Sequence, residues 1–260
     1  MTHPTPARPL VFLHVPKTAG MTLSRIVQRQ FPRERLFEIR GDAADASIAR
    51  LKALPVEERL RIDCLKGHQS FGLHEYLRPG ARYITMLRHP VARIVSHYEY
   101  VRARPAHYLH APSAGWSLER YAGSRLNGEL HNAQTRLLGG VWDDRPLERA
   151  DLDRAIAHLE RHFDWVGLME RFDESVAQLA WTMGWTQVFY RSRNTGRRWD
   201  ASRVPAEAAE VIRRENALDV ELYEHARRRF DAGSPWRRGV RSVAGAGLKG
   251  VGRVATWLRG

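Results

Sequence analysis

The segment PLVFLHVPKTAGMTLSRIVQRQ, residues 9–30, decides how the chain begins to fold. Its first part, Pro9 to Val15, is a short apolar run of the kind that forms a buried strand, and Gly20 to Gln30 carries apolar residues at helical spacing. The turn between them contains Lys17, small residues and one glycine. A strand that passes through such a turn into a helix offers backbone amides and a helix N-terminus to an anion. The segment therefore predicts an α/β unit with an anion-binding turn.

The rest of the chain continues this alternation of short apolar runs and helical patterns. We expect further strands at 36–39, 61–66, 81–87, 164–168 and 187–190, and helices at 91–102, 117–138, 152–162, 173–183 and 206–230. Alternation of this kind predicts an α/β fold, a single P-loop-like domain with a central parallel sheet flanked by helices. We place this domain at residues 1–231 and a basic amphipathic tail at 232–260.

The composition of the chain excludes several classes of protein. The 260 residues include a single cysteine, Cys64, which excludes an internal disulfide framework and a metal site built from several cysteines, and indicates a reducing compartment. No stretch of about 18 apolar residues could span a membrane, and the first residues do not resemble a secretory signal. The formal net charge of +13 favours phosphate, sulfate, nucleic acid or anionic lipid as a partner, although an arginine-rich chain from a GC-rich genome carries a similar charge.

A second basic segment, Arg88 to Tyr98 (RHPVARIVSHY), follows the predicted strand at 81–87. Residues at strand ends in an open parallel sheet face the ligand crevice, so we expect Arg88 at the same edge as Lys17. A guanidinium with a nearby hydroxyl, here Ser96, suits a phosphate monoester. The plainer interpretation of either segment alone is an ordinary strand-to-helix turn with an exposed basic side chain.

Together these segments resemble a known family. The turn at His14–Leu23 is similar to the 5′-phosphosulfate-binding loop, and Arg88–Tyr98 to the 3′-phosphate-binding segment, of sulfotransferases that use 3′-phosphoadenosine 5′-phosphosulfate (PAPS). Lys66–Phe71 (KGHQSF) resembles the turn that carries the catalytic histidine in the carbohydrate group containing heparan sulfate 2-O-sulfotransferase and its bacterial relatives. Two further segments, His131–Arg136 and Val166–Phe172, follow in the family's order, so the resemblance covers about residues 9–200.

The resemblance implies a PAPS-dependent sulfotransferase that acts on a hydroxyl of a carbohydrate or glycolipid, without a metal. His68 would be the general base, and Lys17 would neutralise charge on the bridging and leaving oxygens of the donor. The implied donor-binding residues are Lys17, Thr18, Ala19, Gly20, Met21, Thr22, Arg88, Ser96, Arg193 and Arg197. The basic cluster around the last two is equally well interpreted as a solvated loop.

Several alternatives stay open. Met21 stands where the family usually has Ser or Thr, which leaves Thr22 as the phosphate hydroxyl, and His14 and His97 are alternative bases. A nucleotide kinase or other P-loop phosphotransferase fits the same fold, but Lys17 precedes the glycine, unlike the lysine of a Walker A loop. From another class, a non-catalytic basic module would bind anionic glycan or nucleic acid. Our own expectation includes no nucleic acid partner.

The sequence gives less specific evidence about the acceptor and about the C-terminal tail. Residues 102–116 (RARPAHYLHAPSAGW) fit either an acceptor loop that stacks on a sugar or a disordered connection. From residue 232 onward the chain has six basic residues, no acidic one and apolar residues at helical spacing, which predicts peripheral contact of residues 236–260 with an anionic membrane. Docking on a partner or on the protein's own body is the alternative. Without the membrane anchor of the family's Golgi members, we expect a cytoplasmic, bacterial-type enzyme at the inner membrane surface.

Overall fold

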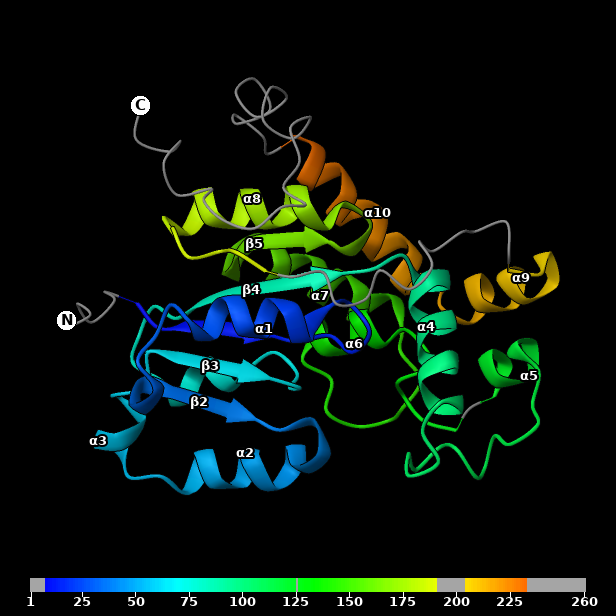
Figure 1. Ribbon diagram of the computed structural model, residues 1–260, viewed down its shortest axis with the longest axis horizontal. Coiled ribbons are helices and arrows are strands. Elements are labelled where there is room, and N and C mark those ends of the chain that lie inside the picture. The colour runs from blue at the N-terminus through cyan, green and yellow to red at the C-terminus, as the bar shows by residue number, and fades with distance from the viewer. Residues whose placement is uncertain (1–7, 125, 191–203, 233–260) are drawn as a thin grey trace.

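The computed structural model describes residues 8–124, 126–190 and 204–232, and a five-stranded sheet forms its centre (Figure 1). The strands are β1 (Leu10–Leu13), β2 (Leu36–Ile39), β3 (Cys64–Gly67), β4 (Arg82–Leu87) and β5 (Phe163–Leu168), in the order β2-β3-β1-β4-β5. Every pairing between neighbouring strands of this sheet is parallel. The chain leaves β1 toward β2 and leaves β4 toward β5, so the strand order reverses between β1 and β4. Open sheets bind ligands at the carboxyl edge of such a switch point. The predicted fold class is confirmed.

Helices cover both faces of the sheet (Figure 1). On one face, α1 (Gly20–Gln28) and α8 (Phe172–Met183) pack against the strands, with Leu23 and Leu179 meeting Phe12 and Trp165. The other face is covered by α2 (Ala44–Ala53), α6 (Ala133–Gly139), α7 (Arg149–His162) and α10 (Ala217–Ala232). Because both faces are buried, the strands are nearly continuous apolar runs, which is why the sequence pattern located them.

Three helices pack beyond the carboxyl ends of the strands: α4 (Pro90–Arg102), α5 (Leu118–Gly123) and α9 (Ala206–Glu215) (Figure 1). They share a separate apolar core that includes Ile94, Tyr121 and Ile212. Pro90 occupies the first turn of α4, where its fixed φ suits the helix. The remaining elements are short: α3 (Val56–Arg59) and the 3-10 turns Arg33–Arg35, Gly41–Ala43, Leu73–Tyr76 and Met169–Arg171.

The predicted helix at 117–138 is wrong in its middle. Within the described part of this range, α5 and α6 are helical and residues 126–132 are not. Asn132, just before α6, has a left-handed φ of 50°, and its backbone N–H donates to the Asn216 side chain at 2.9 Å. Asn132 and Asn216 are far apart in the sequence, so the helical spacing of residues 117–138 could not reveal that this contact interrupts the helix.

Two other predictions need correction. Residues 187–190 form no strand, because two side chains of the turn after α1, Arg29 and Gln30, bond to backbone carbonyls of this segment in place of a neighbouring strand. The predicted helix at 206–230 is two helices, α9 and α10, separated at the buried Asn216. The basic segment at 191–203 and the tail at 233–260 lie outside the described residues, so the boundary between domain and tail stays a prediction.

Candidate active site

The loop after β1 has the shape of an anion cradle. Lys17 and Ala19 adopt left-handed φ values of 71° and 62°, and the buried Thr18 hydroxyl donates to the Val15 carbonyl at 2.8 Å. No side chain caps the N-terminus of α1. Amides at an uncapped helix start are available to an anion, so the loop fits the predicted 5′-phosphate. The backbone N–H of Thr22 already donates to the Ala19 carbonyl at 3.0 Å, so a contact of Thr22 with the phosphate would have to come from its hydroxyl.

Lys17 lies in a strongly cationic and poorly solvated position. Its Nζ stands 3.7 Å from the centroid of the Tyr100 ring on α4. Burial, followed by the charges of Arg104 and Arg88, lowers the pKa of Lys17 to about 8. A phosphate or sulfate beside this ammonium would stabilise its charged form, as the predicted role requires.

Two histidines meet at the carboxyl ends of β1 and β3. The rings of His14 and His68 have centroids 4.2 Å apart. Each ring packs where only a glycine leaves room: a Cβ on Gly20 would lie 1.5 Å from His14 Nε2, and one on Gly41 would lie 2.8 Å from His68 Cδ2. The tertiary structure therefore places the predicted base beside the phosphate loop.

Burial of both imidazoles favours the neutral form, which can accept a proton. Burial lowers the pKa of His68, against the opposing charges of Glu129 and Glu38. Burial and then the charge of His68 hold the pKa of His14 well below its usual value. The assignment of His68 as base stays a prediction, with His14 as the alternative.

His97, the other alternative base, is committed elsewhere. It is buried, and its two ring nitrogens bond to the Tyr121 hydroxyl at 2.8 Å and to Glu129 Oε2 at 2.7 Å. With both nitrogens engaged, the ring is poorly placed to take a proton from an acceptor. Its role is to hold Glu129.

Arg88 lies at the same edge as Lys17, as predicted. Its Nη1 donates to the Lys17 carbonyl at 3.0 Å, so the loop after β1 and the end of β4 are joined directly. The backbone of Arg88 is clamped by the buried Gln134 of α6, which accepts from its N–H and donates to its carbonyl, both at 2.9 Å. Glu170 accepts from the next backbone N–H, that of His89, at 2.9 Å. Sequence reasoning singled out the segments of Gln134 and Glu170 but missed this clamping role.

Only some of the remaining residues predicted to bind PAPS lie in the described part of the chain. Ser96 lies one helical turn before Tyr100 on α4, so it shares the face that contacts Lys17. Met21 is 68% exposed in the first turn of α1. Arg193 and Arg197 lie outside the described residues.

Glu129 is a site residue that the sequence analysis missed, because it fell inside a predicted helix. Its backbone carbonyl accepts from the fully buried Arg93 at 2.7 Å, and its carboxylate bonds to His97. Burial raises the pKa of Glu129, but the His97 hydrogen bond and the charges of His97 and Arg93 outweigh that effect and lower it. The ionised form of the Glu129 carboxylate is therefore favoured, and it is held beside the cationic Arg93.

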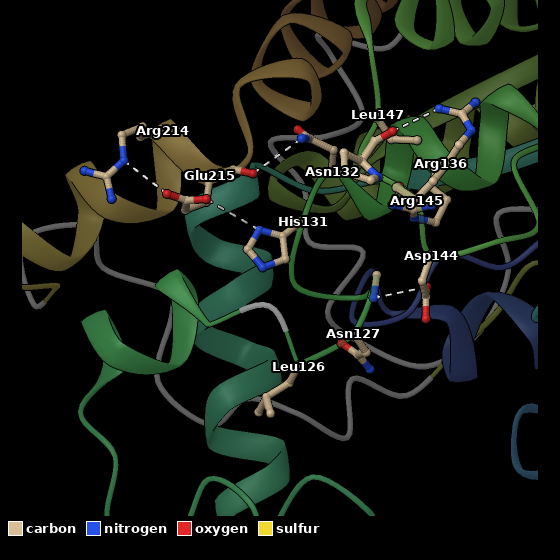
Figure 2. Close-up of a pocket in the computed structure, with 12 residues that line it drawn as sticks. Leu126, Asn127, His131, Asn132, Arg136, Asp144, Arg145, Leu147, Arg214 and Glu215 are labelled. Atoms are coloured by element: carbon tan, nitrogen blue, oxygen red, sulfur yellow. Dashed lines mark hydrogen bonds and ion pairs between the residues drawn. The ribbon is translucent and has the colours of Figure 1, made fainter.

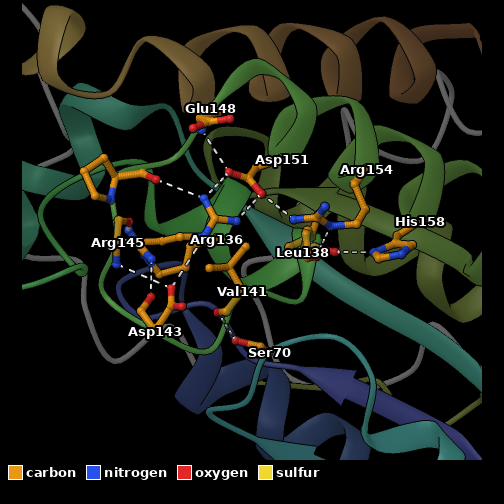
Figure 3. Close-up of polar contacts among 12 residues, drawn as sticks. Ser70, Arg136, Leu138, Val141, Asp143, Arg145, Glu148, Asp151, Arg154 and His158 are labelled. Atoms are coloured by element: carbon orange, nitrogen blue, oxygen red, sulfur yellow. Dashed lines mark hydrogen bonds and ion pairs between the residues drawn. The ribbon is translucent and has the colours of Figure 1, made fainter.

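The segment that carries His68 is braced by the connection between α6 and α7 (Figure 3). Ser70 donates its hydroxyl to the Val141 carbonyl at 3.0 Å. The same connection is secured by Asp151, whose carboxylate accepts two hydrogen bonds from Arg145 at 2.6 and 2.7 Å. The Arg145 hydrogen bond is the largest effect that lowers the pKa of Asp151.

A cavity of about 300 Å³ opens beside the loop between α5 and α6 (Figure 2). Its lining contains neither Lys17, His68 nor Arg88. The residues that line it are Leu126, Asn127, Gly128, His131, Asn132, Arg136, Asp144, Arg145, Pro146, Leu147, Arg214 and Glu215. Over the described parts of the chain, no group of three or more His, Cys, Asp or Glu side chains is placed to hold a metal ion. Within the same parts, no helix is both long and apolar enough to cross a bilayer.

Comparison with known proteins points to a single family. A family model described as galactose-3-O-sulfotransferase matches residues 1–259. The chain is 33% identical over 202 residues to galactose-3-O-sulfotransferase 3 of Bos taurus, an alignment that covers 72% of this chain and 44% of that protein. It is 28% identical over 260 residues to galactosylceramide sulfotransferase of Mus musculus, covering 90% of this chain and 58% of that protein. The chain thus spans about half the length of these curated relatives.

Among solved structures, the chain is similar to mouse sulfotransferase SULT7A1 complexed with PAP. The identity is 14% and the TM-score 0.39, over 82% of this chain and 66% of that one.

Proposed function

Because the chain belongs to the galactose-3-O-sulfotransferase family, we propose that it transfers the sulfuryl group of PAPS to the 3-hydroxyl of a galactose in a carbohydrate or glycolipid. The observation that carries the proposal is the 3.0 Å hydrogen bond from Arg88 Nη1 to the Lys17 carbonyl. This bond holds the anion-binding loop after β1 against the guanidinium of Arg88 at the end of β4. A nucleotide with phosphate groups at both its 5′ and 3′ positions needs this pairing of sites.

The residues at this edge have separate tasks in the reaction. PAPS, when bound, supplies the sulfuryl group. His68 takes the proton of the acceptor hydroxyl as the acceptor oxygen forms its bond to sulfur. Lys17 stabilises the negative charge left on the bridging oxygen of the 5′-phosphate when its bond to sulfur breaks. The products are a sulfate ester, adenosine 3′,5′-bisphosphate and a proton held by His68.

The family match and both curated relatives carry galactose in their names, which supports a galactose acceptor. The motif resemblance indicated a carbohydrate sulfotransferase, and that assignment is confirmed. The finer likeness to the heparan sulfate 2-O group, and to its bacterial members, stays a prediction. We favour galactose over heparan sulfate as the acceptor because the family match spans residues 1–259.

The donor and the acceptor can be tested separately. Calorimetry should show tight binding of adenosine 3′,5′-bisphosphate and weak binding of ATP. Tighter binding of ATP would favour the kinase alternative. Transfer from PAPS should then proceed with lactose or galactosylceramide and fail with unsulfated heparan chains. Transfer to heparan alone would contradict the galactose assignment and return the protein to the group that the motifs resemble.

For residues 236–260 we propose contact with an anionic membrane and, with it, a cytoplasmic location at the inner membrane surface. The support is the six basic residues without an acidic one from residue 232 onward. Each contributes at most about 1 kcal/mol near an anionic surface, and salt screens the attraction. A chain ending at Ala232 should bind adenosine 3′,5′-bisphosphate normally but cosediment less with anionic liposomes at low salt. Equal cosedimentation of the two chains would contradict the proposal.

A further inference from the structure

The segment at 102–116, whose role the sequence left open, carries an exposed aromatic ring that is connected to Lys17 through a series of ring contacts. It runs as a series of turns after α4. The Tyr108 ring is 61% exposed and stacks on His107 with centroids 4.7 Å apart. Its hydroxyl accepts a hydrogen bond from the Asn127 side chain. The ring is therefore held in a defined place while most of its surface faces solvent.

A row of rings connects Tyr108 to the catalytic lysine. Lys17 Nζ lies 3.7 Å from the centroid of Tyr100. Tyr100 meets His107 edge to face at 5.6 Å, and His107 stacks on Tyr108. An acceptor that reacts beside Lys17 would have this aromatic wall next to it.

Asn127 links Glu129 to Tyr108. Its side-chain nitrogen donates to the Tyr108 hydroxyl, and its side-chain oxygen accepts from the backbone N–H of Glu129 at 3.2 Å. The Glu129 side chain is 40% exposed while its Oε2 is anchored to His97. A carboxylate repels a polyanionic donor, so Glu129 suits a position beside an uncharged acceptor. Ionised carboxylates are also strong acceptors for hydroxyl groups.

We propose that Tyr108 and Glu129 form the acceptor site, with galactose stacked on the Tyr108 ring and its hydroxyls donating to the Glu129 carboxylate. The inference rests on the proposed function and deepens it. The axial 4-hydroxyl of galactose leaves a continuous patch of C–H groups on the opposite face, which packs on an aromatic ring. Glucose, with an equatorial 4-hydroxyl, presents a less apolar face. The cavity that Asn127 also lines (Figure 2) gives room for the rest of the acceptor.

The test compares Tyr108→Ala, Tyr108→Phe and Glu129→Gln in the full chain with saturating PAPS. Tyr108→Ala and Glu129→Gln should raise the KM for a β-galactoside about tenfold or more, with a smaller change in kcat. Tyr108→Phe keeps the ring but loses its bond to Asn127, so its KM should lie between those of the wild type and Tyr108→Ala. Tyr108→Ala should also reduce the preference for galactosides over the matching glucosides. Trp181→Ala, which removes an equally exposed ring on α8, is the matched control and should change nothing.

A second measurement does not depend on turnover. With adenosine 3′,5′-bisphosphate bound, saturation-transfer NMR should detect methyl β-galactoside on the wild type and lose it in Tyr108→Ala, while the bisphosphate affinity of both proteins stays equal. A wild type that sulfates galactosides while Tyr108→Ala and Glu129→Gln keep its KM would overturn the acceptor site and leave the proposed function standing. A wild type that binds bisphosphate but neither sulfates nor binds galactosides would overturn the proposed acceptor class and the acceptor site with it.

Discussion

Raising the pH from about 7 to about 9 should weaken the binding of adenosine 3′,5′-bisphosphate about tenfold, because it discharges Lys17. In the free protein, burial and the neighbouring Arg104 and Arg88 lower the pKa of Lys17 to about 8. At one pH unit below this pKa, about nine-tenths of the molecules carry the charge on Lys17. At one unit above it, about one-tenth do. If only the charged form binds well, the apparent Kd rises as that fraction falls.

The direction follows from linkage between binding and protonation. A bound phosphate favours the ammonium, so the pKa of Lys17 is higher in the complex than in the free protein, and binding near pH 8 takes up a proton. His14, His68, Cys64 and the phosphate groups of the ligand do not change charge in this window. The pKa values of His14 and His68 are lowered, burial raises that of Cys64, and a phosphate monoester completes its ionisation near pH 6.

Isothermal calorimetry across this pH range, in buffers of different ionisation enthalpy, measures both the affinity and the proton uptake. Lys17→Arg is the matched control, because a guanidinium stays charged throughout and its affinity should be flat. A flat profile for the wild type, or the same fall in Lys17→Arg, would refute the assignment of a depressed lysine to the donor site.

Three further outcomes follow from the same geometry. In calorimetry, Arg88→Ala should weaken the binding of adenosine 3′,5′-bisphosphate about tenfold to a hundredfold and leave the binding of AMP nearly unchanged, since a charge-assisted contact to the 3′-phosphate is lost. Equal losses of affinity for both nucleotides would contradict that contact. His68→Ala should lower kcat about a hundredfold without changing bisphosphate affinity, and near-normal turnover of this variant would make His14 the base. In the wild type, the rate should fall on the acid side at a pH below the usual histidine pKa, because burial lowers the pKa of His68. Asp219→Ala should lower the free energy of unfolding in urea by about 3 kcal/mol, because this buried carboxylate accepts three hydrogen bonds from the first turn of α6. The control Asp153→Ala, at an exposed carboxylate, should lower it little, and equal losses would contradict the role of Asp219.

Much of the nucleotide side could be predicted from the sequence. Its strands and helices follow from apolar runs and from helical spacing, which are local properties of the chain. The prediction that Lys17 and Arg88 share an edge needed one further rule, that parallel strands end on the same side of a sheet, and the hydrogen bond between them confirms it. The helix predicted at 117–138 was wrong because residues distant in sequence interrupt it, as the bond from Asn132 to Asn216 shows.

By itself, then, the sequence determined the βα units and located the two turns that we propose to bind phosphate, since their signals lie within a few residues of one another. Only the tertiary structure decided which side chains meet in the cleft. Glu129 and His97 lie 32 positions apart, and Gln134 and Arg88 lie 46 apart, so no local pattern joins them. The first pair forms because α4 packs beyond the sheet against the loop that carries Glu129, and the second because α6 packs on the sheet next to the end of β4. In both pairs, polar groups distant in sequence meet where an unpartnered buried group would be costly.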